Sequence, residues 1–167
     1  LIDESTIETH HVQGLPIKVM TPVDYVISSA NFPVLYILHD TDDGQHDENL
    51  ISTFSLLRNN MVSGKLTKSI VVEIPVGTME ISSALMMEIV GLIDTGYHSI
   101  SNRQGRVLLG NEAGGTLATT LVLDNPQVFA SCYLFNALLP DVSIGATGEV
   151  FYYLDATDEC SSYRGNH

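Results

Sequence analysis

The sequence has few groups that could support redox or structural-zinc chemistry, because only two of its 167 residues are cysteines. Cys132 and Cys160 form no C-x-x-C motif, which excludes a zinc knuckle and a thioredoxin-like motif. Cys132 lies in a hydrophobic stretch, so we expect it to be a buried apolar residue. A disulfide between the two cysteines is left open, since nothing in the sequence supports it.

Basic residues and long apolar runs are also scarce. Seven lysines and arginines stand against 20 acidic residues, which gives a net charge of −13. A field of this sign repels phosphate, so we expect neither nucleic acid nor an anionic membrane surface as a partner. No apolar run approaches the ~20 residues that a bilayer-spanning helix needs, so we expect a soluble protein without a membrane span. The acidity would suit a basic partner surface but does not select one.

The chain does contain enough apolar material for one domain. Its hydrophobic fraction is 44%, and a single domain over residues 1–167 is expected, with incompleteness at its C-terminal end left open. No internal repeat, linker or low-complexity segment is seen. The sequence begins at Leu1 and no signal peptide can be read, so the compartment stays open, with a lean toward a secreted or periplasmic location. The oligomeric state is open as well.

Runs of strand-forming residues alternate with stretches of helical periodicity. Helices are expected over residues 47–62, 81–96 and 113–123, and a loop over 136–148. Strands are expected over residues 16–20, 34–39, 69–75, 106–110, 128–135 and 149–154. The first strand reads as an edge strand, and Pro75 is expected to end the third. The alternation predicts an α/β fold, a three-layer sandwich with a mostly parallel sheet and helices on both faces.

A glycine-rich segment, Gly110-Asn111-Glu112-Ala113-Gly114-Gly115, lies between an expected strand and an expected helix. It has the outline of a nucleophile elbow, G-x-S-x-G, with glutamate in place of serine. A carboxylate can act as a nucleophile in principle. Its extra reach would move the attacking oxygen by ~1.5 Å, and a misplacement on that scale costs about 100-fold in rate. We favour a catalytically silent elbow over an unusual carboxylate role, a solvated turn residue or a misread motif.

The strands, the elbow and their spacing together resemble the esterase D-like family of the α/β-hydrolase superfamily. That family includes S-formylglutathione hydrolases, enterochelin esterases, feruloyl esterases and mycolyltransferases. The segments that carry the resemblance are Phe32–His39 (similar to Y-P-V-L-Y-L-L-H-G), Ser69–Pro75 (I-V-V-x-P), Leu92–Tyr97 (L-I-x-x-I-D-x-x-Y), Arg106–Gly115 (R-x-I-x-G-x-S-M-G-G) and Asn125–Phe129 (P-x-x-F). The match covers roughly residues 15–160, and it implies an α/β-hydrolase-like domain that is shortened in places.

The resemblance assigns catalytic positions to particular residues. Glu112 stands at the position of the nucleophile, and Asp158 stands at the position of the triad acid. The triad histidine would follow some tens of residues later, but the sequence ends nine residues on, at His167. Two of the three triad positions are therefore absent or doubtful, and triad members act as a unit.

The resemblance also implies an oxyanion hole built from backbone N–H groups, which would be those of Thr41 and Ala113. Asp40 replaces a glycine of the family in this loop, and an acidic side chain there would repel a developing oxyanion. The leading hypothesis is therefore a degenerate esterase-like domain that lacks serine-ester hydrolysis and is retained for binding or assembly. The alternative is an active carboxylic ester hydrolase or acyltransferase that uses Glu112 in an altered mechanism. A third reading makes the chain one part of a larger assembly. The expected partner is a small ester-like ligand or a protein.

A cluster of titratable residues follows the expected strand 34–39: Asp40, Asp42, Asp43, His46, Asp47 and Glu48. Carboxylate oxygens suit calcium or magnesium, but the spacing does not fit an EF-hand. We favour a solvated acidic loop near the positive end of the next helix. No metal and no cofactor is therefore expected.

Other side chains are expected to have structural roles. His10 and His11 read as a surface pair, because adjacent strand residues point to opposite faces. His39 is expected to make a structural hydrogen bond, and His98 to lie in a polar loop without a visible partner. Three methionines are expected on a helix and in the core: Met79, Met86 and Met87. Three tyrosines could line a pocket or pack in the core: Tyr152, Tyr153 and Tyr163.

Overall fold

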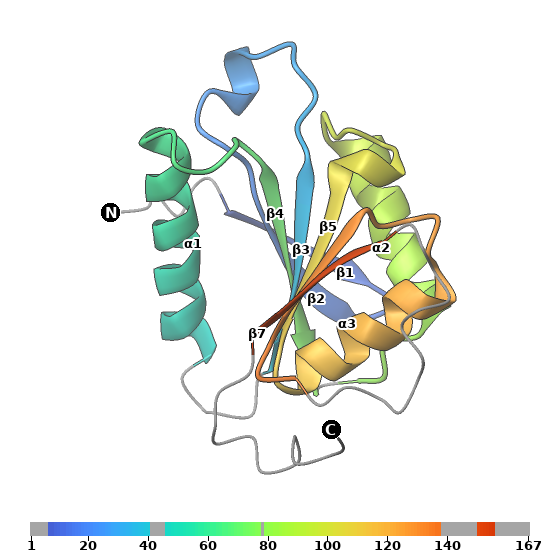
Figure 1. The fold of residues 1–167 in the computed structure, drawn as a ribbon. Coiled ribbons are helices and arrows are strands. Elements are labelled where there is room, and N and C mark those ends of the chain that lie inside the picture. Colours follow the sequence, from blue (N-terminus) through green and yellow to red (C-terminus); the bar gives the residue numbers. More distant parts are fainter. Residues whose placement is uncertain (1–6, 41–45, 78, 138–149, 156–167) are drawn as a thin grey trace.

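The computed structural model describes residues 7–40, 46–77, 79–137 and 150–155, which form one sheet with helices on both faces (Figure 1). The sheet order is β1-β2-β4-β3-β5-β6-β7. The strands are β1 Ile7–Val12, β2 Leu15–Met20, β3 Val34–Asp40, β4 Ile70–Val76, β5 Arg106–Asn111, β6 Ser131–Phe135 and β7 Phe151–Asp155. The α-helices are α1 His46–Val62, α2 Ser83–Gly96 and α3 Ala113–Asp124. The predicted three-layer α/β fold is confirmed.

The sheet is parallel from β4 through β7, and an antiparallel hairpin extends it beyond β4. The prediction that residues 16–20 form an edge strand is wrong, because β2 pairs with β4 on one side and with β1 on the other. The outer strand β1 was not predicted. A tight turn with positive φ at both Gln13 (51°) and Gly14 (88°) joins the two strands, as the twist of a hairpin requires.

Several strand boundaries differ from those predicted. Pro75 does not end β4, which continues to Val76. The antiparallel neighbour β2 pairs only with Val71–Glu73, so Pro75 lies beyond that ladder, where its missing N–H costs no bond to β2. Strand β6 begins at Ser131 rather than 128, and β7 covers Phe151–Asp155.

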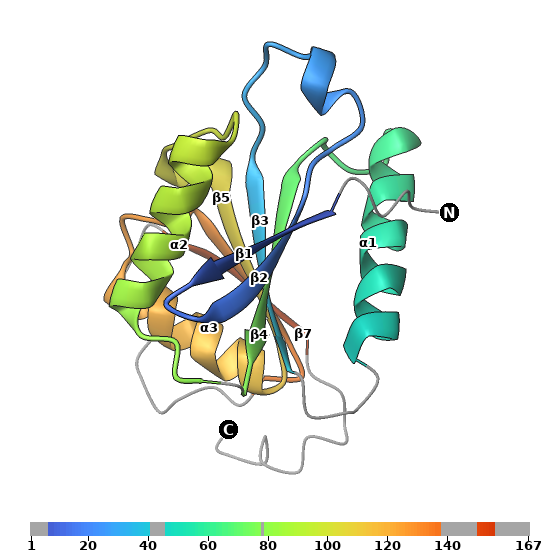
Figure 2. The same ribbon diagram turned by 180° about the vertical axis from the view of Figure 1, so that it is seen from behind.

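Helices cover the two faces unequally (Figure 2). Helices α2 and α3 pack against the larger core cluster, which includes Tyr36, Met86 and Phe129. Helix α1 packs against the opposite face, where Phe54 and Met61 contact residues of β2, β3 and β4. This arrangement follows from right-handed crossovers, because the chain moves in opposite directions across the sheet before and after β4.

Two of the three methionines behave as predicted. Met86 is fully buried in α2, and Met87 packs against the same core. Met79 is a correction: it precedes α2, which begins after its N-cap Ser82, and its side chain is 38% exposed. The Ser82 hydroxyl accepts a hydrogen bond from the N–H of Leu85 and so fixes the start of α2 at Ser83, four residues beyond that methionine.

Candidate functional site

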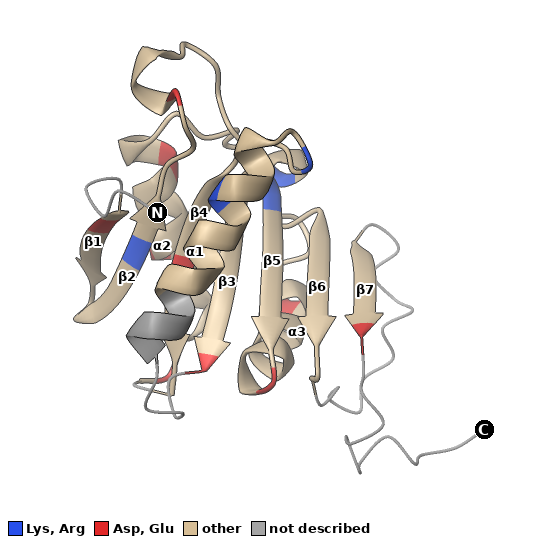
Figure 3. Ribbon diagram, turned by 90° about the vertical axis from the view of Figure 1, so that its left-hand side faces the viewer, with Lys and Arg blue, Asp and Glu red and all other residues tan. Residues whose placement is uncertain are grey.

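The five parallel strands end at one edge of the sheet, and a sharp turn follows β5 at that edge (Figure 3). Glu112 joins β5 to α3 with φ 53° and ψ −119°. A residue with a Cβ rarely adopts positive φ, and such strain costs on the order of 1–3 kcal/mol. The turn thus holds Glu112 in a backbone conformation that it would not adopt alone, and its side chain is exposed.

Three glycines around Glu112 allow strand and helix to approach closely. A Cβ on Gly110 would lie 2.3 Å from the carbonyl oxygen of Gly114, and a Cβ on Gly114 would lie 2.3 Å from the carbonyl oxygen of Leu38. A Cβ on Gly115 would lie 2.4 Å from the Cβ of Ala137. Each of these distances is far below van der Waals contact, so a side chain at any of these positions would force α3 away from the sheet.

Backbone hydrogen bonds tie this turn to the neighbouring strand ends. The N–H of Glu112 donates to the carbonyl of Phe135 at 2.9 Å, and the N–H of Asn136 donates to the carbonyl of Asp155 at 2.9 Å. Asn136 also has a positive φ of 49°. The carbonyl of Glu112 accepts from the N–H of Gly115 at 3.0 Å, which begins α3. The ends of β5, β6 and β7 are therefore linked in series around Glu112.

The electrostatics at this edge are mixed. The Glu112 side chain makes no capping hydrogen bond to α3, although a carboxylate near a helix N-terminus is stabilised by the helix dipole. Asp40 and Asp155 end β3 and β7 at the same edge, where Figure 3 shows the acidic residues of the strand ends. The first N–H groups of α3 lie beside Glu112, while Asp40 and Asp155 add carboxylates at the ends of β3 and β7.

The structure describes only part of the predicted site. Ala113 is the first residue of α3, directly after Glu112, where helix N–H groups have no intrahelical acceptor. Thr41 and Asp158 lie outside the described residues, as do Tyr163, Cys160 and most of the acidic loop. His39 is half-buried in β3, opposite Pro75 in the register.

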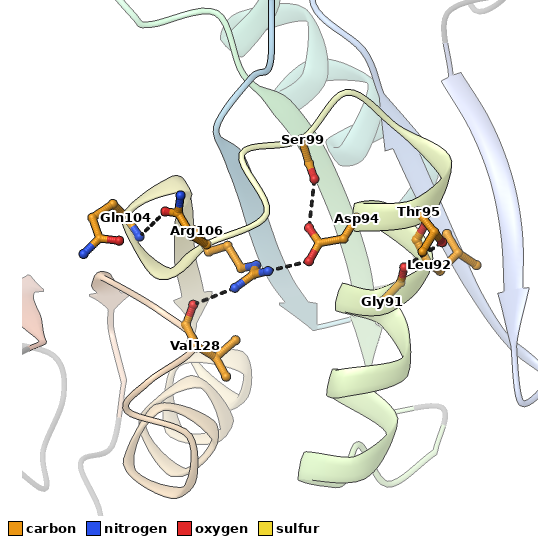
Figure 4. Close-up of polar contacts among 9 residues, drawn as sticks. Gly91, Leu92, Asp94, Thr95, Ser99, Gln104, Arg106 and Val128 are labelled. Carbon is orange, nitrogen blue, oxygen red and sulfur yellow. Dashed lines mark hydrogen bonds and ion pairs between the residues drawn. The ribbon is translucent and has the colours of Figure 1, made fainter.

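A buried charged network at the opposite end of the sheet was not predicted (Figure 4). A guanidinium nitrogen of Arg106 donates to the carboxylate of Asp94, and its other terminal nitrogen donates to the carbonyl of Val128 at 3.4 Å. The Ser99 hydroxyl donates to the second oxygen of Asp94 at 2.8 Å. The side chains of Arg106 and Asp94 are only 10% and 18% exposed. Their pairing joins the end of α2 to the start of β5.

The hydroxyl of Tyr36 lies buried near this network, beside the Arg106 guanidinium. Burial and, to a smaller extent, the Asp94 carboxylate raise the pKa of Tyr36. The ring packs edge-on against Phe129, with 5.9 Å between the centroids. Because this group lies at the amino ends of the parallel strands, we assign the network a structural role rather than a part in the elbow site.

The predictions for two histidines need correction. His98 does have a partner, Tyr25. The backbone N–H of His98 donates to the Tyr25 hydroxyl at 2.8 Å, and the centroids of the two rings lie 5.2 Å apart. His10 is half-buried rather than a plain surface residue, with its Nε2 2.6 Å from the Tyr97 hydroxyl. That hydroxyl also donates to the carboxylate of Glu8 at 2.7 Å. Burial first, and then Glu8, raises the pKa of Tyr97.

Metal and thiol chemistry find no support in the part of the chain that the structure describes. No group of three or more metal-ligating side chains occurs there. Cys132 is a free, fully buried thiol in β6, as predicted, and burial raises its pKa to about 12. A thiol with this pKa stays protonated and unreactive at neutral pH. No helix among the described residues has both the length and the hydropathy for a membrane span.

Comparisons with known proteins find similar folds in solved esterase structures. The sequence matches no protein-family model and no curated relative. A ferulic acid esterase structure matches with a TM-score of 0.64 at 20% identity, covering 82% of this chain and 60% of that one. A ferulic acid esterase from Anaeromyces mucronatus matches with a TM-score of 0.62 at 17% identity, covering 78% and 57%. An S-formylglutathione hydrolase from Staphylococcus aureus matches with a TM-score of 0.60 at 15% identity, covering 79% and 56%.

The chain therefore has an α/β fold similar to that of these esterase structures. At these identities the similarity establishes the fold alone. The chain spans about 60% or less of the length of these three esterases.

Proposed function

We propose that this chain is an esterase-like α/β-hydrolase domain that lacks serine-ester hydrolysis and serves binding or assembly. The observation that carries the proposal is the turn after β5, where Glu112 occupies the strained position, with φ 53° and ψ −119°, between closely packed glycines. This backbone geometry supports the reading of position 112 as that of a nucleophile, and the side chain there is a carboxylate. A hydroxyl nucleophile is absent from that position.

The expected ligand follows from the same features. Asp40, Glu112 and Asp155 lie at the carboxyl ends of β3, β5 and β7 and add negative charge to this edge of the sheet. They disfavour the oxyanion that ester cleavage would form there. A small neutral or cationic ester-like ligand, or a protein partner, suits this edge better than an anionic substrate.

Hydrolysis of short p-nitrophenyl esters tests the proposal, with the natural chain measured beside Glu112→Ser and Glu112→Ala. We expect the natural chain and the alanine variant to be inert. Labelling by a fluorophosphonate probe should likewise be absent. Turnover by the natural chain above the rate of the alanine variant would refute the proposal.

The second candidate function is ester hydrolysis or acyl transfer with Glu112 as nucleophile or base. The retained strain favours it, because strained residues are concentrated at active sites. Glu112→Gln distinguishes the two functions, since the amide keeps the size of the side chain and removes its basicity. Loss of a measurable turnover in that variant would support the second function, and unchanged turnover would exclude it.

A further inference from the structure

The connection between β2 and β3, residues 21–33, carries two adjacent apolar side chains that are almost fully exposed. Val26 is 92% exposed and Ile27 is 84% exposed, and both belong to the short 3₁₀ helix η2, Tyr25–Ile27. We call these two side chains the apolar tip. Figure 1 shows η2 in blue at the top of the molecule, beyond the start of β3. Single exposed apolar residues are common at protein surfaces, but an adjacent pair that projects from the molecule marks a candidate contact site.

Contacts of the residues beside the apolar tip hold it in place. The Asp24 carboxylate pairs at 2.9 Å with Lys68, which lies just before β4. The Tyr25 hydroxyl accepts a hydrogen bond from the backbone N–H of His98 at 2.8 Å. The Tyr25 ring also packs against that of Phe32, with 5.7 Å between the centroids. The two apolar side chains therefore stand on a fixed backbone, which limits the entropy that is lost when a partner binds.

The charges around the apolar tip differ from those of the chain as a whole, whose net charge is −13. The β2–β3 connection contains one charged residue, Asp24, and the α1–β4 connection, residues 63–69, contains Lys65 and Lys68. The pair of Asp24 with Lys68 joins the two connections. The acidic residues that end or follow β3, β5 and β7 lie at the opposite edge of the sheet (Figure 3). The two connections therefore form a part of the surface with more basic than acidic residues.

This distribution of charge favours a second copy of the chain as the partner. Contact through the apolar tips keeps the acidic edges of the two copies at opposite ends of the pair, where their repulsion is weakest. A two-fold contact places the same surface on both sides, so the lysines of one copy can pair with the aspartate of the other. We propose that two copies of this chain associate through their apolar tips, with Val26 and Ile27 of each packed against those of the other. The contact lies at the opposite end of the sheet from Glu112 and is independent of the proposed function.

The size of this surface predicts a weak dimer. A standard interface uses about 20–30 residues on each side. The two connections, residues 21–33 and 63–69, together reach only the lower end of that range. We therefore expect a Kd on the order of 10–100 μM. Because a two-fold contact is closed, association should stop at the dimer.

Sedimentation velocity tests the proposal at concentrations from about tenfold below to about tenfold above the expected Kd. The natural chain should pass from monomer to dimer over this range. Ile27→Asp brings like charges together across the two-fold axis and should raise the Kd at least about tenfold. Val26→Ser is the second variant if the first fails to fold by circular dichroism. Leu56→Asp is the matched control, because Leu56 is 63% exposed in the middle of α1 and the change in charge is the same; it should dimerise like the natural chain.

A single tryptophan locates the contact. This chain contains no tryptophan, so the emission of Val26→Trp reports on the apolar tip alone. That emission should shift to the blue as the concentration rises through the Kd, because the indole ring leaves water when the two tips meet. Leu56→Trp is the control, and its emission should not depend on concentration.

Four results would overturn the proposal. One is a natural chain that stays monomeric at every concentration. Another is undiminished dimerisation by folded Ile27→Asp or Val26→Ser. The third is growth beyond the dimer, which would show that the apolar tip contacts a different surface of the next copy. The fourth is a blue shift of the Val26→Trp emission on phosphatidylcholine vesicles while the chain stays monomeric, because the occupant would then be a bilayer.

Discussion

The strain at Glu112 predicts that glycine at this position gives a more stable protein than alanine does. Its φ of 53° and ψ of −119° cost on the order of 1–3 kcal/mol for a residue with a Cβ. Glycine removes that cost but adds about 0.5–1 kcal/mol of backbone entropy. Glu112→Gly should therefore be more stable than Glu112→Ala by about 0.5–2 kcal/mol, which raises Tm by about 1–8 °C in a domain of this size.

The comparison of glycine with alanine isolates the backbone. Both variants lose the carboxylate near the N-terminus of α3, and only alanine keeps the Cβ. Urea unfolding followed by circular dichroism measures the difference. At Thr120, an exposed position of the same helix, the order should reverse, with glycine about 1 kcal/mol less stable than alanine. If the glycine variant at 112 is no more stable than the alanine variant, the turn is not strained and the reasoning fails.

Three further predictions concern the packing of the fold. Gly114→Ala should lower the free energy of unfolding by at least about 1–3 kcal/mol, because its Cβ would meet the carbonyl oxygen of Leu38. Gly91→Ala is the control in the same urea assay. Its Cβ meets nothing within 4 Å, so it should stabilise α2 by about 0.5–1 kcal/mol. Arg106→Leu removes the charge partner of the Asp94 carboxylate and should lower the free energy of unfolding by about 3–5 kcal/mol. Lys68→Ala is the comparison at the surface. Lys68 pairs with Asp24 and is 45% exposed, so its loss should cost less than about 1 kcal/mol. The Cys132 thiol, with its pKa raised to about 12, should be alkylated only on unfolding at pH 8. Stability should also fall as pH rises above about 8.5, because the unfolded chain then loses a proton that the folded chain keeps.

The sequence predicted the central architecture because the buried strands are continuous apolar runs. Residues 34–39 and 70–74 are almost uniformly apolar, as expected of strands covered on both faces. Strand β1 was missed because its sequence, IETHHV, lacks apolar alternation and half of its residues are exposed. It is held by pairing with β2 and by the contact of His10 with Tyr97, 87 residues away. The Gly14 turn was the one local signal that could have revealed it.

The candidate site was predictable only where its residues are contiguous. The elbow is one short segment, so its glycines and Glu112 could be read together. The pairing of Asp94 with Arg106 joins two elements across a loop, and no periodicity marks it. The contact between the rings of Tyr133 and Tyr153 was also not foreseen, because the two residues meet only through the strand register.

The turn at Glu112 shows that the surroundings, rather than the residue itself, determine the geometry of the elbow. Gly110 and Gly114 fix the distance between β5 and α3, and the bond from the Glu112 N–H to Phe135 fixes the direction of the chain. None of these contacts involves the side chain at position 112. A serine there would therefore inherit the same backbone, so Glu112→Ser alters the chemistry and leaves the fold unchanged. Ester hydrolysis by that variant would show that the rest of the machinery is intact, and an inert variant would locate the loss elsewhere in the site.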